Sequence, residues 1–400
     1  MLDRVLTTLN LRSTVTLLLA ALMLSVAVAC GSDASPAAQV TQPTSTPTDL
    51  VAATAEPTLA PSPVPVSTET VSPTATVEPT ATAAATSTPE ADPRNAIFAT
   101  VPGIVDPTNF GWPRKVETST GVIEIAARPE RVYSLSLGHA EIIAALRGGK
   151  VLVATASFFK DPGTSASYAE FVGSPDAGSD PEEVIGLDPE IVIASAFTSA
   201  DLIEQLTAVG VNVVRADLED SALGNVPNIL LLGYMMGAED RAIELADEVT
   251  RRVKFISDSV DAADPTRPRV VAMSRWSDIY VAGEGSTEGG IIVAAGAINA
   301  AAEEGVVSHQ VVGIEGIAAM NPDIIILTQP EQSALEFADE LYNDPVLADV
   351  PAIKNRMIVY GNPTFYTTLS HWNVRGIEES AKIFYPEIFG DTVFPAFTHP

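Results

Sequence analysis

Residues 238–262 read AEDRAIELADEVTRRVKFISDSVDA, and this stretch decides how the rest of the chain is interpreted. Apolar residues recur at the spacing of one helix face, and most other positions are charged. The apolar face consists of Ala242, Leu245, Ala246, Val249, Val253, Ile256 and Val260. Acids open the stretch and bases gather in its second half, an order that suits the helix macrodipole. Because Gly237 precedes the stretch and Asp264-Pro265 follows it, we predict one long helix over residues 237–264.

A similar pattern stands on each side of this helix. Residues 182–193 read EEVIGLDPEIVI and residues 315–326 read EGIAAMNPDIII, and the two segments align without a gap. Each predicts a short helix opened by an acid, an Asp-Pro or Asn-Pro turn, and a buried parallel strand. Any α/β unit could produce one such pattern, but the gapless match favours two lobes of like construction. We place these lobes at residues 96–236 and 265–400.

The first 29 residues predict a signal peptide, because a basic start precedes an apolar run too short to span a membrane comfortably. The segment Ala27-Val-Ala-Cys30-Gly-Ser32 resembles the lipobox of bacterial lipoproteins, whose cysteine is acylated. Ordinary cleavage at a small-residue site is the alternative. Cys30 is the only cysteine, so no intramolecular disulfide can form. We expect lipidation of Cys30 and an extracytoplasmic, membrane-anchored protein.

Residues 30–95 predict a disordered tether, since they are rich in Thr, Pro, Ala and Ser and cannot bury enough apolar surface to fold. The whole chain carries 51 acidic and 22 basic residues. This balance argues against a nucleic-acid partner.

The remaining residues alternate between strand and helix patterns, which predicts mainly parallel sheets covered on both faces. A hairpin is expected at residues 112–125, and a strand, turn and helix at 128–141. Further strands are expected at residues 151–155, 211–215, 269–273, 279–282 and 357–360, and helices at 200–209, 290–295, 331–342 and 373–384. The segment GEGSTE at 283–288 lacks the third glycine of a dinucleotide-binding loop, so we reject that interpretation.

Five motifs recur in a specific order along the folded part. They are RPERV with SLSLGHAE at 128–141, DPEIVI at 188–193, NPDIII at 321–326, PAIK at 351–354 and AKIFYP at 381–386. Together they resemble the substrate-binding proteins of ABC importers for iron complexes and cobalamin. The resemblance covers about residues 113–389 and implies two Rossmann-like lobes joined by a single rigid helix, a monomer, and a ligand held between the lobes. It also implies a permease with a cytoplasmic ATPase as partner, gripped through Glu182 and Glu315, with Glu183 as an alternative in the N-terminal lobe.

The ligand should lie at the carboxyl ends of the strands, where open α/β sheets generally bind. The loops expected there carry His139, Phe158, Phe159, Ser174, His309, Phe365, Tyr366, His371, Trp372 and Arg375. Aromatic rings suit a macrocycle or catechol, and Arg375 could pair with a ligand carboxylate. Each histidine could coordinate a metal or be an ordinary hydrogen-bonding loop residue. Phe158 and Phe159 could equally be core residues, and siderophore, haem and cobalamin all remain open.

The contrasting functional class is an enzyme. The chain has no Gly-x-Ser-x-Gly elbow, no His-Glu-x-x-His helix and no His/Cys metal cluster, so we predict no catalytic residue and no cofactor. A sensory ligand-binding lipoprotein stays open as an alternative, as does a tethered extracellular hydrolase. The favoured prediction is the solute-binding component of an ABC importer.

Overall fold

A computed structural model describes residues 92–119, 121–217 and 221–397. The chain divides into two units, residues 1–84 and 85–400, and the described residues all belong to the second. The predicted signal peptide, Cys30 and most of the predicted tether lie outside the described residues. None of the described helices is long and apolar enough to cross a membrane.

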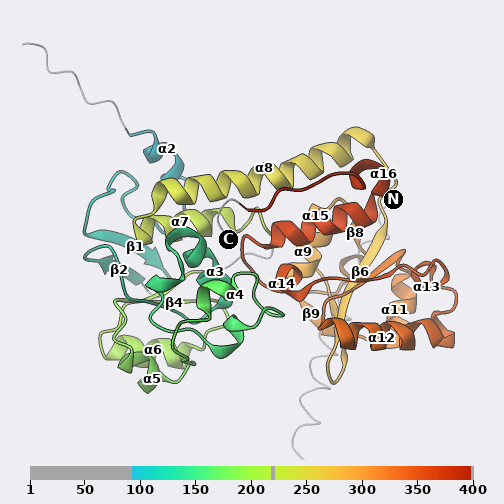
Figure 1. Ribbon diagram of the computed structural model, residues 1–400, viewed down its shortest axis with the longest axis horizontal. Coiled ribbons are helices and arrows are strands. Elements are labelled where there is room, and N and C mark those ends of the chain that lie inside the picture. Colours follow the sequence, from blue (N-terminus) through green and yellow to red (C-terminus); the bar gives the residue numbers. More distant parts are fainter. Residues whose placement is uncertain (1–91, 120, 218–220, 398–400) are drawn as a thin grey trace, which may run out of the picture. The chain divides into compact units, whose positions relative to one another are not determined.

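The N-terminal half of this unit is built on a three-stranded parallel sheet (Figure 1). Its strands are β3 (Val132–Ser134), β4 (Ile191–Ala194) and β5 (Val213–Arg215). Alternate side chains point to opposite faces, as strand geometry requires. Ile191 and Ile193 pack into one apolar cluster with α3 (Leu137–Arg147) and α7 (Val226–Met236). Val192 packs into another with α5 (Pro181–Gly186) and α6 (Ala200–Ala208).

Shorter elements complete this half. They are α2 (Arg94–Phe98), the hairpin β1 (Arg114–Thr118) and β2 (Gly121–Ile125), the 3-10 turns η1 (Gly149–Val151) and η2 (Ser157–Lys160), and α4 (Tyr168–Phe171). The antiparallel pairing of β1 with β2 confirms the predicted hairpin.

The C-terminal half is built on a six-stranded mixed sheet. Its strands are β6 (Arg269–Arg275), β7 (Ile279–Ala282), β8 (Ile298–Asn299), β9 (His309–Val311), β10 (Ile324–Leu327) and β11 (Ile358–Tyr360). Strands β11, β10 and β6 run parallel, β8 pairs parallel with β6, and β7 and β9 add an antiparallel edge. The sheet is therefore parallel at its centre, as predicted, and antiparallel at one side.

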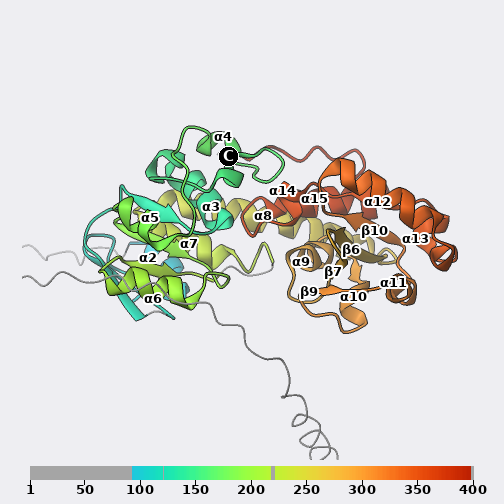
Figure 2. The same cartoon turned by 90° about the horizontal axis from the view of Figure 1, so that it is seen from below.

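Helices cover both faces of the second sheet as well (Figure 2). One face packs on α9 (Thr287–Ala294) and α15 (Asn373–Phe384), and the other on α10 (Ala300–Glu303), α11 (Ile314–Met320), α12 (Glu331–Asn343) and α13 (Pro351–Lys354). The remaining elements are η3 (Pro345–Leu347), α14 (Pro363–Tyr366) and α16 (Pro386–Phe389).

The long helix α8 (Glu239–Ala263) agrees with the predicted helix, and all seven residues of its predicted apolar face are buried. It contacts α7 at one end and α9, α15 and α16 farther along, as Figure 1 shows. These contacts merge the inner faces of both sheets into one apolar cluster that includes Val132, Val249 and Val270.

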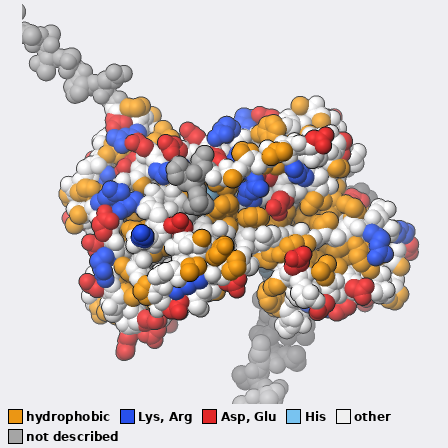
Figure 3. All heavy atoms as spheres, viewed as in Figure 1, with side chains coloured by type: hydrophobic (Ala, Val, Ile, Leu, Met, Phe, Trp, Pro, Cys, Tyr) orange, Lys and Arg blue, Asp and Glu red, His pale blue; other side chains and the backbone are white. Residues whose placement is uncertain are grey.

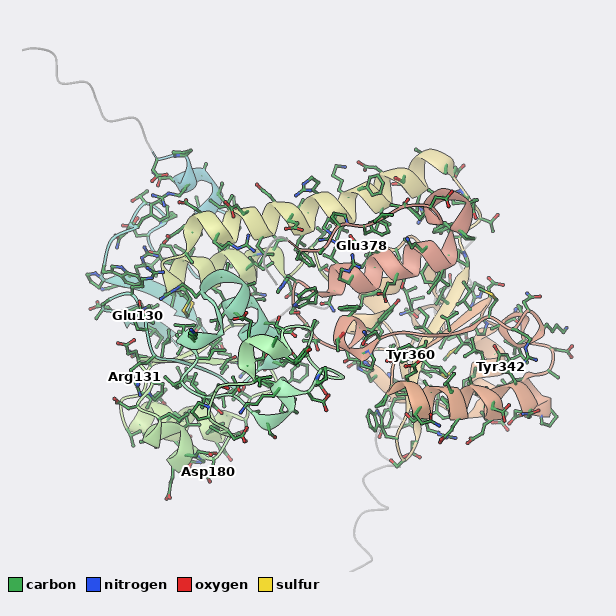
Figure 4. The ribbon with its side chains drawn as sticks, viewed as in Figure 1. Glu130, Arg131, Asp180, Tyr342, Tyr360 and Glu378 are labelled. Atoms are coloured by element: carbon green, nitrogen blue, oxygen red, sulfur yellow. The ribbon has the colours of Figure 1, made fainter. Side chains whose placement is uncertain are left out.

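Buried ion pairs fasten α8 to both halves. Arg252 donates to both carboxylate oxygens of Glu378 on α15, at 2.7 and 3.0 Å, and to Glu248 one turn before it at 2.9 Å. Glu378 lies on the side of α15 that faces α8 (Figure 4). At the other end, buried Arg114 pairs with Glu239 in the first turn of α8. Removing one partner of such a pair leaves a buried charge without compensation, which is strongly destabilising.

The predicted repeat is present in the structure as α5–β4 and α11–β10. Asp188 and Asn321 occupy the same place in the two copies, and both adopt the left-handed conformation, with φ of 51° and 46°. The neighbouring strands pair in the same register, Val132 opposite Ile191 and Val270 opposite Ile324.

An arginine clamp extends this repeat beyond the predicted twelve positions. Arg131 (labelled in Figure 4) donates to the carbonyl oxygens of Leu187 and Asp188 at the end of α5, and Arg269 donates to that of Met320 at the end of α11. In return, Glu190 accepts the Arg131 N–H at 3.0 Å and Asp323 accepts the Arg269 N–H at 2.9 Å. A cation at a helix C-terminus is favoured by the helix dipole.

One expected strand did not form, and one helix was not predicted. Residues 151–155 do not form a strand of the sheet, because only single bridges tie Leu152 to Val132 and Thr155 to Asp176. Helix α7 was missed, since nine of its residues are buried and a helix that is apolar all round shows no periodic face.

Candidate ligand-binding site

Two neighbouring cavities lie where parallel strands of both sheets end. The first, of about 470 Å³, we call the His309 cavity, and the second, of about 330 Å³, the Phe197 cavity. Thr164 and Thr367 line both of them. Residues that follow β3 and β4 reach the Phe197 cavity, and residues that follow β6 and β10 reach the His309 cavity. We refer to the two cavities together as the cleft.

A histidine–carboxylate pair lies in the His309 cavity. His309 begins β9, and its Nε2 lies 2.9 Å from Oε2 of Glu288 in the first turn of α9. Glu288 is 5% exposed, and its other oxygen lies 3.5 Å from the Thr328 hydroxyl. The His309 side chain is 43% exposed. Because the Nε2–H can donate to the carboxylate, Nδ1 keeps its lone pair, and it has no hydrogen-bond partner among the described residues. A carboxylate behind an imidazole is the arrangement that orients histidines toward metals.

The hydrogen bond to Glu288 raises the pKa of His309 above its ordinary value of 6.5, and burial only partly opposes this. A proton and a metal would compete for Nδ1. Any coordination by His309 should therefore weaken as the pH falls through the raised pKa.

Exposed aromatic rings form the walls of the cleft. Phe158, Phe197 and Trp276 are 53%, 87% and 67% exposed, although all three line the cavities. Large rings that the fold leaves in water inside a cavity provide flat, rigid contact area for a ligand. Between them lie hydroxyl groups, including those of Ser136, Ser195 and the two shared threonines. Among the described residues, Glu288 and His309 are the only acidic or basic ones that line these two cavities.

Of the predicted ligand-binding residues, the structure brings Phe158 and His309 together in the cleft. Four others lie in the core: His139, Phe159, Tyr366 and His371 are at most 1% exposed. Burial lowers the pKa of His139 to about 4 and that of His371 to about 3, so both are neutral at physiological pH. These four side chains are therefore buried in the core and do not form the surface of the cleft.

The last four predicted residues are held by partners inside the protein. Ser174 donates to the Phe171 carbonyl at 2.9 Å, and Phe365 stacks on Trp372 with centroids 6.1 Å apart. Trp372 donates from Nε1 to the Ser167 hydroxyl at 2.9 Å. Arg375, which was expected to meet a ligand carboxylate, donates from Nη1 to Glu378 at 2.7 Å and is not among the residues that line either cavity.

Sequence reasoning missed Glu288, Phe197, Trp276 and Tyr280, all of which line the cleft. Trp276 follows β6 directly and Phe197 lies in the loop just after β4, so the rule that ligands bind at the carboxyl ends of strands could have found them. Glu288 belongs to the segment GEGSTE, which was considered only as a dinucleotide loop. No short-range signal marks its pairing with His309, which lies 21 positions away.

The two expected docking acids lie in equivalent places. Glu182 and Glu315 are exposed in the first turns of α5 and α11, the two helices of the repeat. Glu183 is also exposed, but its carboxylate accepts the Gly178 N–H at 2.8 Å. Figure 3 shows acidic side chains gathered over α5, where Asp180, Glu182 and Glu183 are all exposed.

Comparison with known proteins places this geometry in a family. The family described as periplasmic binding protein matches residues 132–364. This chain belongs to the periplasmic binding protein family. An uncharacterized ABC transporter substrate-binding lipoprotein, YvrC of Bacillus subtilis, is 27% identical over 279 residues, which cover 68% of this chain and 85% of YvrC. A cobalamin-binding protein of Halobacterium salinarum is 28% identical over 211 residues, 52% of this chain and 57% of that protein.

Solved structures of other periplasmic binding proteins share the fold. Haem-binding RhuT from Roseiflexus sp. RS-1 has a TM-score of 0.57 at 25% identity, covering 64% of this chain and 98% of RhuT. Molybdate-bound MolA of Haemophilus influenzae has a TM-score of 0.59 at 20% identity, covering 70% of this chain and 93% of MolA. The expected family resemblance is confirmed, and the α/β fold with parallel strands agrees with it.

The His309–Glu288 pair yields a direct prediction. Glu288→Gln keeps the shape of the side chain but removes its charge, so the pKa of His309 should fall toward or below 6.5. A pH titration of the His309 ring signals by NMR measures this. Because the pair raises the folded-state pKa, its stabilising effect is complete below the ordinary pKa and is lost as the pH rises through the raised value. The difference in unfolding free energy between wild type and variant should therefore shrink as the pH rises.

The matched control is Glu284→Gln, which removes an exposed acid just before α9. It should leave the His309 titration unchanged. An unaltered His309 pKa in Glu288→Gln would contradict the proposed coupling.

Proposed function

We propose that this chain is the extracytoplasmic solute-binding component of an ABC importer, which captures an iron complex or cobalamin in the cleft and delivers it to a membrane permease. The observation that carries this proposal is a cleft at the strand ends of a periplasmic binding protein, walled by exposed aromatic rings and holding an oriented histidine. Relatives named for cobalamin, haem and ABC transport support it.

The chemistry of the cleft favours a metal complex with an apolar, flat ligand shell. The described residues contain no group of three or more His, Cys, Asp and Glu side chains placed to hold a metal ion. A complexed metal brings most of its ligands with it and needs at most one or two from the protein. In this proposal His309 contributes Nδ1, Glu288 fixes the ring, and Trp276 and Phe197 contact the flat ligand shell.

We further propose that α8 is a stiff connector between two lobes, with the limits 96–236, 237–264 and 265–400 given above. Its support is the burial of its apolar face against helices of both halves and the buried pairs of Arg114 and Arg252. A helix packed along its length in this way resists bending, because bending would open a close-packed core.

The permease would be gripped through Glu182 and Glu315. Their support is that the two copies of the repeat expose an acid at the same position of the same helix. The arginine clamps at Arg131 and Arg269 hold both helices in the same way. Two equivalent acids, one per lobe, suit a partner that presents two equivalent basic pockets.

The choice of cargo can be measured by absorption spectroscopy of the mature protein with hemin, cyanocobalamin or a ferric catecholate. We expect one of these chromophores to bind and its metal-sensitive bands to shift. His309→Ala should remove the shift and weaken binding by more than the roughly 10- to 100-fold known for groups that support a metal ligand, because His309 would be the ligand itself. Trp276→Ala is the matched comparison, since it should weaken binding without changing the position of the bands. Failure of all three chromophores to bind would overturn the cargo proposal.

The stiff connector can be tested by small-angle scattering with and without ligand. A large closure of the two lobes on binding would overturn it.

Docking can be tested by reconstituted transport with Glu182→Lys and Glu315→Lys. Exposed ion pairs are worth at most about 1 kcal/mol, so alanine variants should have small effects. Lysine adds repulsion and should reduce uptake clearly, with unchanged affinity for the cargo. Glu183→Lys controls for charge in the same helix turn and should act less strongly, because that carboxylate has a partner within its own loop. Normal uptake by the double lysine variant would exclude this docking mode.

Lipidation of Cys30, which lies outside the described residues, can be tested separately. Acylation at Cys30 should carry the protein into the detergent phase of a Triton X-114 partition, and Cys30→Ser should release it into the aqueous phase. Equal partitioning of the two proteins would contradict lipidation.

A further inference from the structure

A buried glutamate lies beneath the cleft without a counterion among the described residues. Glu141 of α3 is 0% exposed, and it forms no ion pair within the part of the chain that the structure describes. Burial raises the pKa of Glu141, while the hydrogen bonds that it accepts oppose this shift. An isolated carboxyl group in a core is costly unless its oxygen atoms are fully engaged.

The hydrogen-bond partners of Glu141 come from two segments far apart in the sequence. Its Oε1 accepts the Ser165 hydroxyl at 2.7 Å and the N–H groups of Ala166 at 3.0 Å and Ser167 at 3.4 Å. Its Oε2 accepts the Ser370 hydroxyl at 2.6 Å. Ser370 belongs to the C-terminal half and lies 229 positions from Glu141, so this one carboxyl group connects the two halves.

Both segments continue directly into the walls of the cleft. Gly163 and Thr164, just before Ser165, line the His309 cavity, and residues 367–369, just before Ser370, line the Phe197 cavity. We call residues 163–167 the first rim and residues 367–372 the second rim. Thr164 and Thr367 are the two residues shared by the cavities, so the two rims meet at the boundary between them.

A second contact joins the rims directly. Trp372 Nε1 donates to the Ser167 hydroxyl at 2.9 Å. The second rim is also tied to α15, because the Asn373 side chain donates to the carbonyl oxygens of Phe365 and Thr368 at 3.0 and 2.6 Å. The serines that hold the rims are buried, whereas Gly163 and Thr367 at the cleft surface are exposed. Fixed polar groups thus lie directly beneath the residues that would meet a ligand.

We propose that Glu141 is a positioning residue that latches the two rims together and so preforms the cleft before ligand binds. The hydrogen bonds of the latch join α3 to the two rims and involve no residue of α8, and they fix the separation of Thr164 from Thr367. The relevance of the latch to ligand binding rests on the proposed function. The presence of the latch in the ligand-free protein does not depend on that function. The latch explains why predicted cleft residues such as Trp372 have internal partners: they hold the rim in place beneath the binding surface.

Two serine variants separate the latch from local structure, because each removes one hydroxyl donor from the same carboxyl group. Ser370→Ala removes the donor from the other half of the protein, and Ser165→Ala removes a donor from the same half. Hydrogen–deuterium exchange of the ligand-free mature protein reports opening of each rim separately. We expect Ser370→Ala to increase exchange about tenfold in both rims, since Ser370 supplies the hydrogen bond that ties the second rim to Glu141 and its loss lets the two rims separate. We expect Ser165→Ala to increase exchange in the first rim alone, because the N–H groups of Ala166 and Ser167 still bind Glu141 and Ser370 still ties the second rim to it.

Glu141→Gln adds a second measurement, because it keeps the side-chain volume but cannot satisfy every donor. It should increase exchange in both rims and lower the association rate of hemin or cyanocobalamin, while the exchange of α8 stays unchanged. Unchanged exchange in both rims of Ser370→Ala, or the same pattern in the two serine variants, would overturn the latch. If Glu141→Gln does not fold, the serine pair still decides the question. If neither chromophore binds wild type, the proposed cargo fails while the exchange result on the latch stands.

Discussion

The apolar face of α8 has to be buried along its whole length, and the rest of the structure depends on this constraint. One half of the face packs on α7 and the other on α9, α15 and α16. The inner faces of both sheets join the same apolar cluster, so neither half completes its core without the helix. Buried Arg252 reinforces this junction, because its pairing with Glu378 can be satisfied only when α8 and α15 are packed together. Stability and the spacing of the two sheets therefore come from the same contacts.

Duplication gives each sheet the same local construction. In both copies an arginine at the start of one strand holds the end of the repeat helix, and an acid of the next strand accepts the arginine N–H. This exchange fixes strand register and helix position together. As a result, the exposed acids Glu182 and Glu315 are presented in equivalent ways. The carboxyl ends of the strands are also equivalent, which places cleft residues from both sheets opposite one another.

The residues that form the surface of the cleft and the residues that hold them in place lie in two different layers. The surface is formed by Phe197 and Trp276, which follow strands, and by His309, which begins β9 and pairs with Glu288. The aromatic and polar residues of the segment before α15 lie one layer deeper and hold the rims through Glu141 and Ser167. A binding surface without much charge of its own needs such support, because rigid rings and hydroxyl groups select a ligand only when their positions are fixed.

The sequence by itself determined the long helix, the repeat, the class of fold and the family, because these depend on hydrophobic period and on motifs within short segments. Asp188 and Asn321, for example, each mark a turn that their own neighbours specify. Only the tertiary structure decided which loop residues line the cleft. His309 and His371 were both expected on loops at the cleft. The structure places His309 in the cleft beside Glu288, whereas His371 is buried against Trp372 and Phe397. That difference depends on contacts between segments far apart in the chain, and no local pattern records which side of a loop the packed core will cover.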